Sequence, residues 1–157
     1  MKAWIRLSPP LWIILLIFSG CTNPDKELTN EILNKPREQR GVALSRLSGE
    51  KQVDVYLYAY RRMEPPVILA GELADNWRTT LQPVTVRLAR EDNETSAVGL
   101  MMILSAISSQ YCSLAKRDDV LTAATEAISK IRQPYSELAE RQLRLMKTPE
   151  KQLPPCR

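Results

Sequence analysis

Apolar residues recur at spacings of three and four over most of the chain after residue 27, a pattern typical of helices with one buried face. From residue 50 onward the pattern predicts helices over 50–63, 66–74, 81–90, 95–111, 120–131 and 135–147. One or two further short helices are expected before Gly49, where Leu28, Ile32 and Leu44 supply the apolar positions. Counting at most one of the two short N-terminal segments as ordered, we expect an all-α fold of six or seven helices with short connections, either a compact irregular bundle or a short HEAT-like array.

The segment 50–63 is the ambiguous one. Its run from Val53 to Tyr58 is β-branched and aromatic enough for a strand. The polar residues before this run and Arg61-Arg62 after it favour one continuous helix, and no partner strand is evident elsewhere. A helix is the prediction here.

The segment 95–111 is apolar almost all round, which is the pattern of a helix buried on every side. We expect it to be the central helix of the fold. Trp77 and Arg78 lie between two predicted helices and are expected in a connector. The polar residues 35–40 include Pro36 and are expected to form a linker.

Helices that open with a proline recur at Pro66 and Pro134, and helix pairs follow each other at intervals of roughly 30 to 40 residues. This arrangement faintly resembles the helix pairs of HEAT-like α-solenoids. Because no sequence motif repeats, we expect a compact irregular bundle before a solenoid.

The first twenty residues have the layout of a secretory signal. Lys2 and Arg6 precede eight consecutive apolar residues, 11–18, and small residues follow. The ending Phe18-Ser19-Gly20-Cys21 resembles the bacterial lipobox, although Phe18 stands where the family usually has Leu. The resemblance implies cleavage after residue 20 and lipidation of Cys21.

Two alternatives to the lipobox are less favoured. Ordinary signal-peptidase cleavage wants a small residue where Phe18 stands, and a retained transmembrane helix needs about 20 apolar residues. The predicted organisation is therefore a signal peptide over 1–20, a lipidated tether over 21–49 and a helical domain over 50–157.

Cysteine usage agrees with export. If lipid takes Cys21, Cys112 and Cys156 remain as an even pair, which in an oxidising compartment predicts one disulfide; two free thiols are the alternative. Thr22 stands where an Asp would signal retention at the inner membrane. By resemblance, this implies the periplasmic face of the outer membrane of a Gram-negative bacterium.

Charge and composition argue against several functions. The chain has 22 Lys and Arg against 18 Asp and Glu, and loss of Lys2 and Arg6 leaves a mature net charge of +2, so nucleic-acid binding is not expected. It has no histidine, no phosphate-binding loop and no nucleophile elbow. The acidic run Glu91–Glu94 is explained by helix capping, although a carboxylate-only site stays open. We expect no enzyme activity, no cofactor and no metal.

Two clusters are candidates for partner binding, because Tyr, Trp and Arg are enriched at interface hot spots. In the first, Tyr56 and Tyr60 share one helix face and Tyr58 lies on the other. The alternative for that cluster is that Tyr56 and Tyr60 are core residues. The candidate residues are Tyr56, Tyr58, Tyr60, Arg61, Arg62, Trp77 and Arg78.

The function expected from these features is that of an outer-membrane lipoprotein that binds a periplasmic or envelope protein. The more specific hypothesis is an immunity or inhibitor protein against an envelope-targeting toxin or hydrolase. The alternative is a secretion-system pilotin or envelope scaffold. The last third of the chain, with Tyr111-Cys112, Thr148-Pro149 and Cys156, faintly resembles small pilotins of type II secretion.

Overall fold

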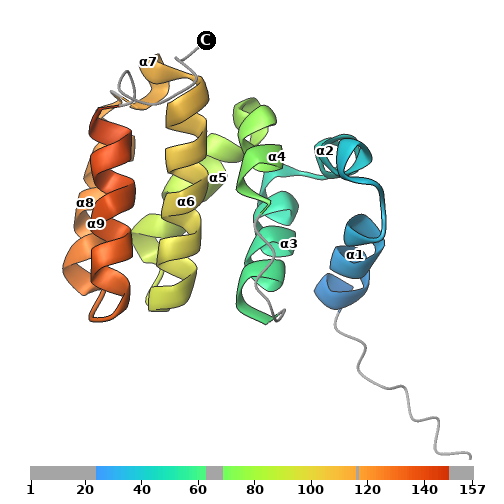
Figure 1. Cartoon of the computed structure of the whole chain (residues 1–157), viewed down its shortest axis with the longest axis horizontal. Helices are drawn as coiled ribbons and strands as arrows, with labels where there is room; N and C mark the ends of the chain where they lie inside the picture. Colours follow the sequence, from blue (N-terminus) through green and yellow to red (C-terminus); the bar gives the residue numbers. More distant parts are fainter. Residues whose placement is uncertain (1–23, 63–68, 116, 149–157) are drawn as a thin grey trace, which may run out of the picture.

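The computed structural model describes residues 24–62, 69–115 and 117–148, and within these ranges the regular secondary structure is all α-helix (Figure 1). The helices are α1 (Pro24–Leu33), α2 (Arg37–Ser45), α3 (Gly49–Arg62), α4 (Ala70–Asp75), α5 (Trp77–Arg90), α6 (Glu94–Gln110), α7 (Cys112–Ala115), α8 (Asp118–Lys130) and α9 (Tyr135–Lys147). The all-α prediction is confirmed. The expected count of six or seven is too low, because both short N-terminal helices form and a one-turn helix, α7, follows α6.

Helix α6 is the centre of the fold, as its all-round apolar sequence predicts. It contacts α3, α4, α5, α7, α8 and α9. In Figure 1 it runs between the α8–α9 pair on one side and α3 and α4 on the other. Its side chains from Ser96 to Met101 are all buried. No helix in the described parts of the chain has the length and apolar character needed to cross a membrane.

Helix α3 confirms the choice of a helix over a strand for the ambiguous segment. Ser48 precedes it, and its Oγ accepts a hydrogen bond from the backbone N–H of Lys51 at 3.3 Å. This bond satisfies one of the free N–H groups at the start of the helix. Gly49 then brings α3 against α5: a Cβ at this position would lie 1.9 Å from the carbonyl oxygen of Thr79.

Helix α5 begins at Trp77, four residues before the predicted start. Trp77 and Arg78 therefore lie in a helical turn and not in a connector. The sequence pattern missed this turn because Pro83 was expected in the first turn of the helix, where proline is tolerated. Pro83 lies further inside α5. Only Asn76 separates α4 from α5, and its carbonyl accepts the backbone N–H groups of Thr79 and Thr80.

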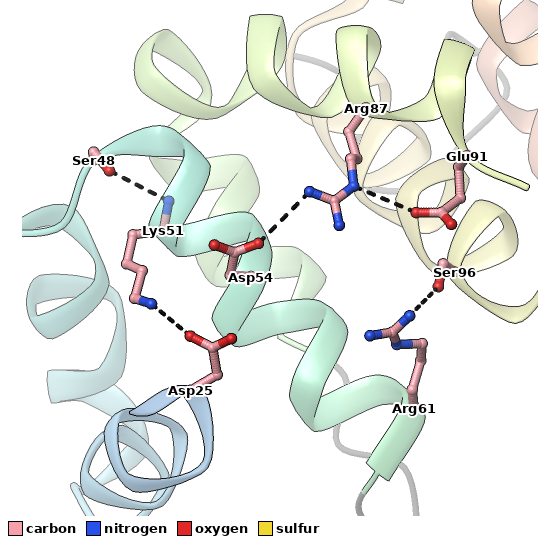
Figure 2. Close-up of polar contacts among 8 residues, drawn as sticks. All are labelled: Asp25, Ser48, Lys51, Asp54, Arg61, Arg87, Glu91 and Ser96. Atoms are coloured by element: carbon pink, nitrogen blue, oxygen red, sulfur yellow. Dashed lines mark hydrogen bonds and ion pairs between the residues drawn. The ribbon is translucent and has the colours of Figure 1, made fainter. Parts of the chain in front are cut away.

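The residues before Gly49 pack against the later helices. Ile32 and Leu44 are 2% and 0% exposed, α1 contacts α3, and α2 contacts α4. Asp25 of α1 pairs with Lys51 of α3 (Figure 2). The expected linker over residues 35–40 is wrong from Arg37 onward, since α2 begins there.

A side chain of α2 explains why the turn between α1 and α2 is ordered. The guanidinium of Arg40 donates to the carbonyl oxygens of Lys35 and Leu33 at 3.1 and 3.0 Å. These are free carbonyls at the end of α1, which a cation stabilises.

Several predictions lie outside the described residues: the signal peptide with Cys21, the start of the predicted helix 66–74, and Cys156. The choice between an irregular bundle and a HEAT-like array stays a prediction.

Candidate functional site

Residues of α2, α4 and α6 line an open groove of about 410 Å³, which we name the α2–α4–α6 groove. The sequence pattern did not predict it, because its walls come from three separate helices. Its lining residues are Arg37, Glu38 and Gly41 of α2, Gly71, Glu72 and Asp75 of α4, and Gln110 of α6.

Two glycines line the groove, and the space beside each of them is open. A Cβ at Gly41 or at Gly71 would have no neighbour within 4 Å, so neither wall is filled by the packing around it. The α2 wall is held in place by Asn76, whose Nδ2 donates to the carbonyl of Gly41 and to Oε1 of Gln52, each at 3.3 Å. Gln52 is 0% exposed and in turn donates to the carbonyl of Leu47 at 3.1 Å. This buried network fixes α2 relative to α3 and α4.

The groove carries more negative than positive charge. Glu38, Glu72 and Asp75 face one cation, Arg37, and none of these four side chains forms an ion pair with another described residue. Oε1 of Gln110 is buried and has no hydrogen-bond partner among the described residues. The groove lining therefore has a net negative charge and one buried acceptor without a described donor.

A pair of aromatic rings follows the groove residues in the chain. Trp77 comes two residues after Asp75, and Tyr111 comes directly after Gln110. The two half-buried rings are in contact, with centroids 5.5 Å apart and planes inclined at 49°. The guanidinium carbon of the exposed Arg78 lies 5.0 Å from the centre of the Trp77 ring, a cation–π arrangement. The structure thus brings one predicted cluster, Trp77 and Arg78, to the neighbourhood of the groove.

The other predicted cluster is divided between core and surface. Tyr56 and Tyr60 share a face, as expected, and their rings stack with centroids 5.8 Å apart and planes at 9°. They pack on Gly99 of α6, where a Cβ would lie 2.9 Å from Cδ1 of Tyr60. Tyr56 is 0% exposed, so it belongs to the core and is not presented to a partner. Tyr58 and Tyr60 are half-buried.

The two core-facing tyrosines stay neutral well above neutral pH. Burial raises the pKa of Tyr56, with a smaller contribution from Tyr60, and burial also raises the pKa of Tyr60. The hydroxyl of Tyr56 has no hydrogen-bond partner among the described residues. These features describe an apolar packing role and not an acid–base one.

Arg61 and Arg62 end α3 beside the start of α6. The guanidinium of Arg61 donates to Oγ of Ser96 at 3.0 Å, and Ser96 is itself bound to the capping residue Asn93 (Figure 2). Both arginines line a smaller hollow of about 260 Å³ with Asn93 and Thr95. Arg61 therefore supports the fold, while Arg62 is exposed and has no hydrogen-bond or ion-pair partner among the described residues.

The acidic run Glu91–Glu94 is also structural in large part. Asn93, and not an acid, is the capping residue of α6, and its Oδ1 accepts the backbone N–H of Ser96 at 2.9 Å. Glu91 accepts the N–H of Asn93 and pairs with Arg87, which also approaches Asp54 (Figure 2). Within the described ranges, no three Cys, Asp or Glu side chains are grouped so that they could hold a metal ion.

Of the three cysteines, Cys112 is described: it begins α7 and is half-buried. Cys21 and Cys156 lie outside the described residues. Comparison with known proteins found no matching family, no matching curated protein and no matching solved structure.

Proposed function

We propose that this protein is a lipid-anchored envelope protein that works by binding another protein. The observation that carries the proposal is the α2–α4–α6 groove, with unpaired charges and the half-buried Trp77 and Tyr111 rings next to its lining residues in the chain. Trp, Tyr and Arg dominate the binding energy of protein interfaces, and a concave site lets a partner bury them. Arg78 is exposed and lies over the Trp77 ring.

The proposed location rests on the signal-like segment and Cys21. Lipidation of Cys21 would hold the protein at one membrane. Thr22, which replaces the Asp that would signal retention at the inner membrane, favours the periplasmic side of the outer membrane. A lipid anchor raises the effective concentration of a binding protein at that membrane, so a modest interface suffices. A disulfide between Cys112 and Cys156 is part of the proposal and would join the C-terminal segment to α7.

Within this class, we favour an immunity or inhibitor protein that blocks an envelope-targeting toxin or hydrolase. Its small size, proposed anchor and lack of histidine support binding over catalysis, and we assign it no enzyme activity and no cofactor. The second candidate is a pilotin or envelope scaffold, favoured by the pilotin-like last third of the chain.

Site-specific photo-cross-linking in cells that produce the protein tests the binding proposal. A photoreactive amino acid replaces Arg78, and in the matched control it replaces Glu126, an exposed residue of α8. We expect a discrete cross-linked protein with the probe at 78 and none at 126. Identification of a toxin or hydrolase supports the immunity function, and a secretin component supports the pilotin. No cross-linked protein at either position would overturn the proposal.

The anchor is tested separately. Cys21→Ala should abolish labelling by a fatty-acid analogue and release the protein from the membrane fraction. A Cys21→Ala protein that stays in the membrane fraction would show that the N-terminal segment is retained as a helix. Titration of thiols in the denatured, unreduced mature protein should find none, and two reactive thiols would exclude the disulfide.

A further inference from the structure

We infer that the protein rests on the phospholipid surface of its membrane through one side, the α1–α2 edge, which comprises residues 24–46. This inference rests on the lipid anchor of the proposed function and adds the face of the protein that meets the membrane. Three properties carry it: the short chain between Cys21 and α1, the position of α1 and α2 in the fold, and the side chains on one face of α2.

The chain between the proposed anchor and the folded protein is short. Two residues separate Cys21 from Pro24, the first residue of α1. Three steps along the backbone span at most about 11 Å. Helix α1 is itself held by the fold, because it packs against α3 and its Asp25 pairs with Lys51. A lipid on Cys21 would therefore hold the start of α1, and the fold behind it, close to the membrane surface.

Helices α1 and α2 form one edge of the molecule. In Figure 1 they lie beyond α3 and α4, and α8 and α9 form the opposite edge. The helices packed closely on α1 are α2 and α3, and those packed closely on α2 are α1 and α4, so each has an outer side. The ten residues of α1 make it about 15 Å long. When α1 lies along the membrane, α2 reaches the same surface, and α8 and α9 are turned away from it.

One face of α2 carries side chains suited to a phospholipid surface. Four residues follow the i, i+3, i+4, i+7 spacing of a single helix face, and with Lys35 they line a hollow of about 260 Å³: Gln39, Val42, Ala43 and Arg46. The lining has two cations and no carboxylate. Val42 is 56% exposed, more than any other large apolar side chain in the described ranges.

The charges of this face are complementary to lipid phosphates. The guanidinium of Arg46 has no hydrogen-bond or ion-pair partner among the described residues, and Lys35, which pairs with Glu31 at 3.3 Å, adds a second cation. Long basic side chains lay their apolar stems along an apolar surface and keep their charged ends at its polar boundary. Such an arrangement places Val42 at the apolar level and the two cations at the phosphates.

Contact with lipid is compatible with binding of a protein. The α2 residues that line the α2–α4–α6 groove are Arg37, Glu38 and Gly41, and none of them lines the hollow beside Val42. The anchor supplies most of the membrane affinity, since it keeps the edge at a high effective concentration next to the lipid. The α1–α2 edge then needs only to fix the orientation of the protein.

The test uses the mature protein, purified from the membrane fraction and reconstituted in vesicles of phosphatidylethanolamine and phosphatidylglycerol. A fluorescent amino acid replaces Val42, and in the matched control it replaces Tyr135, an exposed apolar residue of α9 on the opposite edge. The vesicles contain a lipid with a nitroxide on its headgroup, which quenches a fluorophore that lies close to it. We expect a loss of emission from the label at 42 and none from the label at 135.

A charge variant tests the chemistry of the contact. Arg46→Gln removes the unpaired cation of the hollow. The ratio of docked to undocked protein, read from the quenching at 42, should fall about fivefold, because one cation near an anionic bilayer contributes about that factor to binding. Arg141→Gln removes an exposed arginine of α9 and should leave the ratio unchanged. Circular dichroism confirms that each variant is folded.

No quenching at 42, equal quenching at 42 and 135, or an unchanged ratio in Arg46→Gln would overturn the inference. Its failure is distinct from that of the proposed anchor, because labelling by a fatty-acid analogue is read on the same protein. If Cys21 carries lipid and the label at 42 is not quenched, the anchor stands, the docked edge is wrong and that edge is left for a protein partner. If the label at 42 is quenched and Cys21 takes up no fatty acid, the membrane contact stands and the lipidation is wrong.

Discussion

The contact between Gly49 and the backbone of α5 leads to a sharp prediction for Gly49→Ala. The new methyl group would lie 1.9 Å from the carbonyl oxygen of Thr79 and 2.9 Å from Cγ of Pro83. Real Cβ atoms essentially never come closer than 3.0 Å to another heavy atom, so α3 and α5 must separate by about 1.1 Å at this point. The obstacle is backbone and cannot be relieved by a change of rotamer.

The structure also indicates how large the effect is. Inserting a methyl group into packed structure costs typically 1–3 kcal/mol, and a clash with backbone falls at the upper end. Alanine gains back at most about 1 kcal/mol of helix propensity over glycine. We therefore expect Gly49→Ala to lower the free energy of unfolding by about 2 kcal/mol. For a chain of this size, that corresponds to a fall in Tm of roughly 4–8 °C.

Urea unfolding followed by circular dichroism at 222 nm measures this change, with a thermal scan as a second readout. Gly41→Ala is the matched control. A Cβ at Gly41 has nothing within 4 Å and Gly41 lies inside α2, so this variant should be more stable than the wild type by about 0.5–1 kcal/mol. If Gly49→Ala were as stable as the wild type, the close approach of α3 to α5 would be refuted.

Further predictions concern two other residues. Tyr56→Phe should raise the free energy of unfolding by up to about 1 kcal/mol, because it removes a buried hydroxyl that lacks a described hydrogen-bond partner. If urea unfolding showed the Tyr56→Phe protein to be less stable than the wild type by that amount, this prediction would be contradicted. Burial raises the pKa of Tyr56 above its ordinary value of 10.0, so above that pH the unfolded chain releases this proton first and wild-type stability should fall. Tyr56→Phe should make this fall shallower by up to about 1.4 kcal/mol per pH unit, and equal slopes from pH 9 to 11 would contradict the burial of the hydroxyl. Asn93→Ala should lower the free energy of unfolding in urea by about 1 kcal/mol by removing the cap of α6, while Asn93→Asp should keep the cap; an Asn93→Ala protein as stable as the wild type would show that the cap contributes nothing.

The sequence predicts helices well here because their evidence is local. The three-to-four spacing marks each long helix, and the absence of a polar face over 95–111 is enough to place α6 at the centre. The shared helix face of Tyr56 and Tyr60 likewise follows from the helical period, whereas the stacking of their rings is seen only in the structure. What the period does not give is which face is buried, since that depends on Gly99, far away in the chain.

The groove could not be predicted because it has no local pattern. Its lining includes Gly41 and Gly71, and in the sequence a glycine inside a short helix indicates only low helix propensity. It also includes Gln110, which lies at the end of a third helix. The residue type of Trp77 marks it as a candidate for partner binding, but its contact with Tyr111 depends on α5 starting four residues earlier than the spacing indicates. Asn76, which holds α2 to α3, is an ordinary polar residue until those helices meet.

The central place of α6 has a consequence for how the protein folds. Its neighbours come from both sides of it in the sequence: α3, α4 and α5 precede it, and α7, α8 and α9 follow. Because α6 is apolar on every side, it exposes apolar surface to water as long as half of the helices that cover it are missing. We therefore expect no stable folding intermediate lacking α9, and a single cooperative unfolding transition. During synthesis, the chain would depend on a chaperone until its last helix is available.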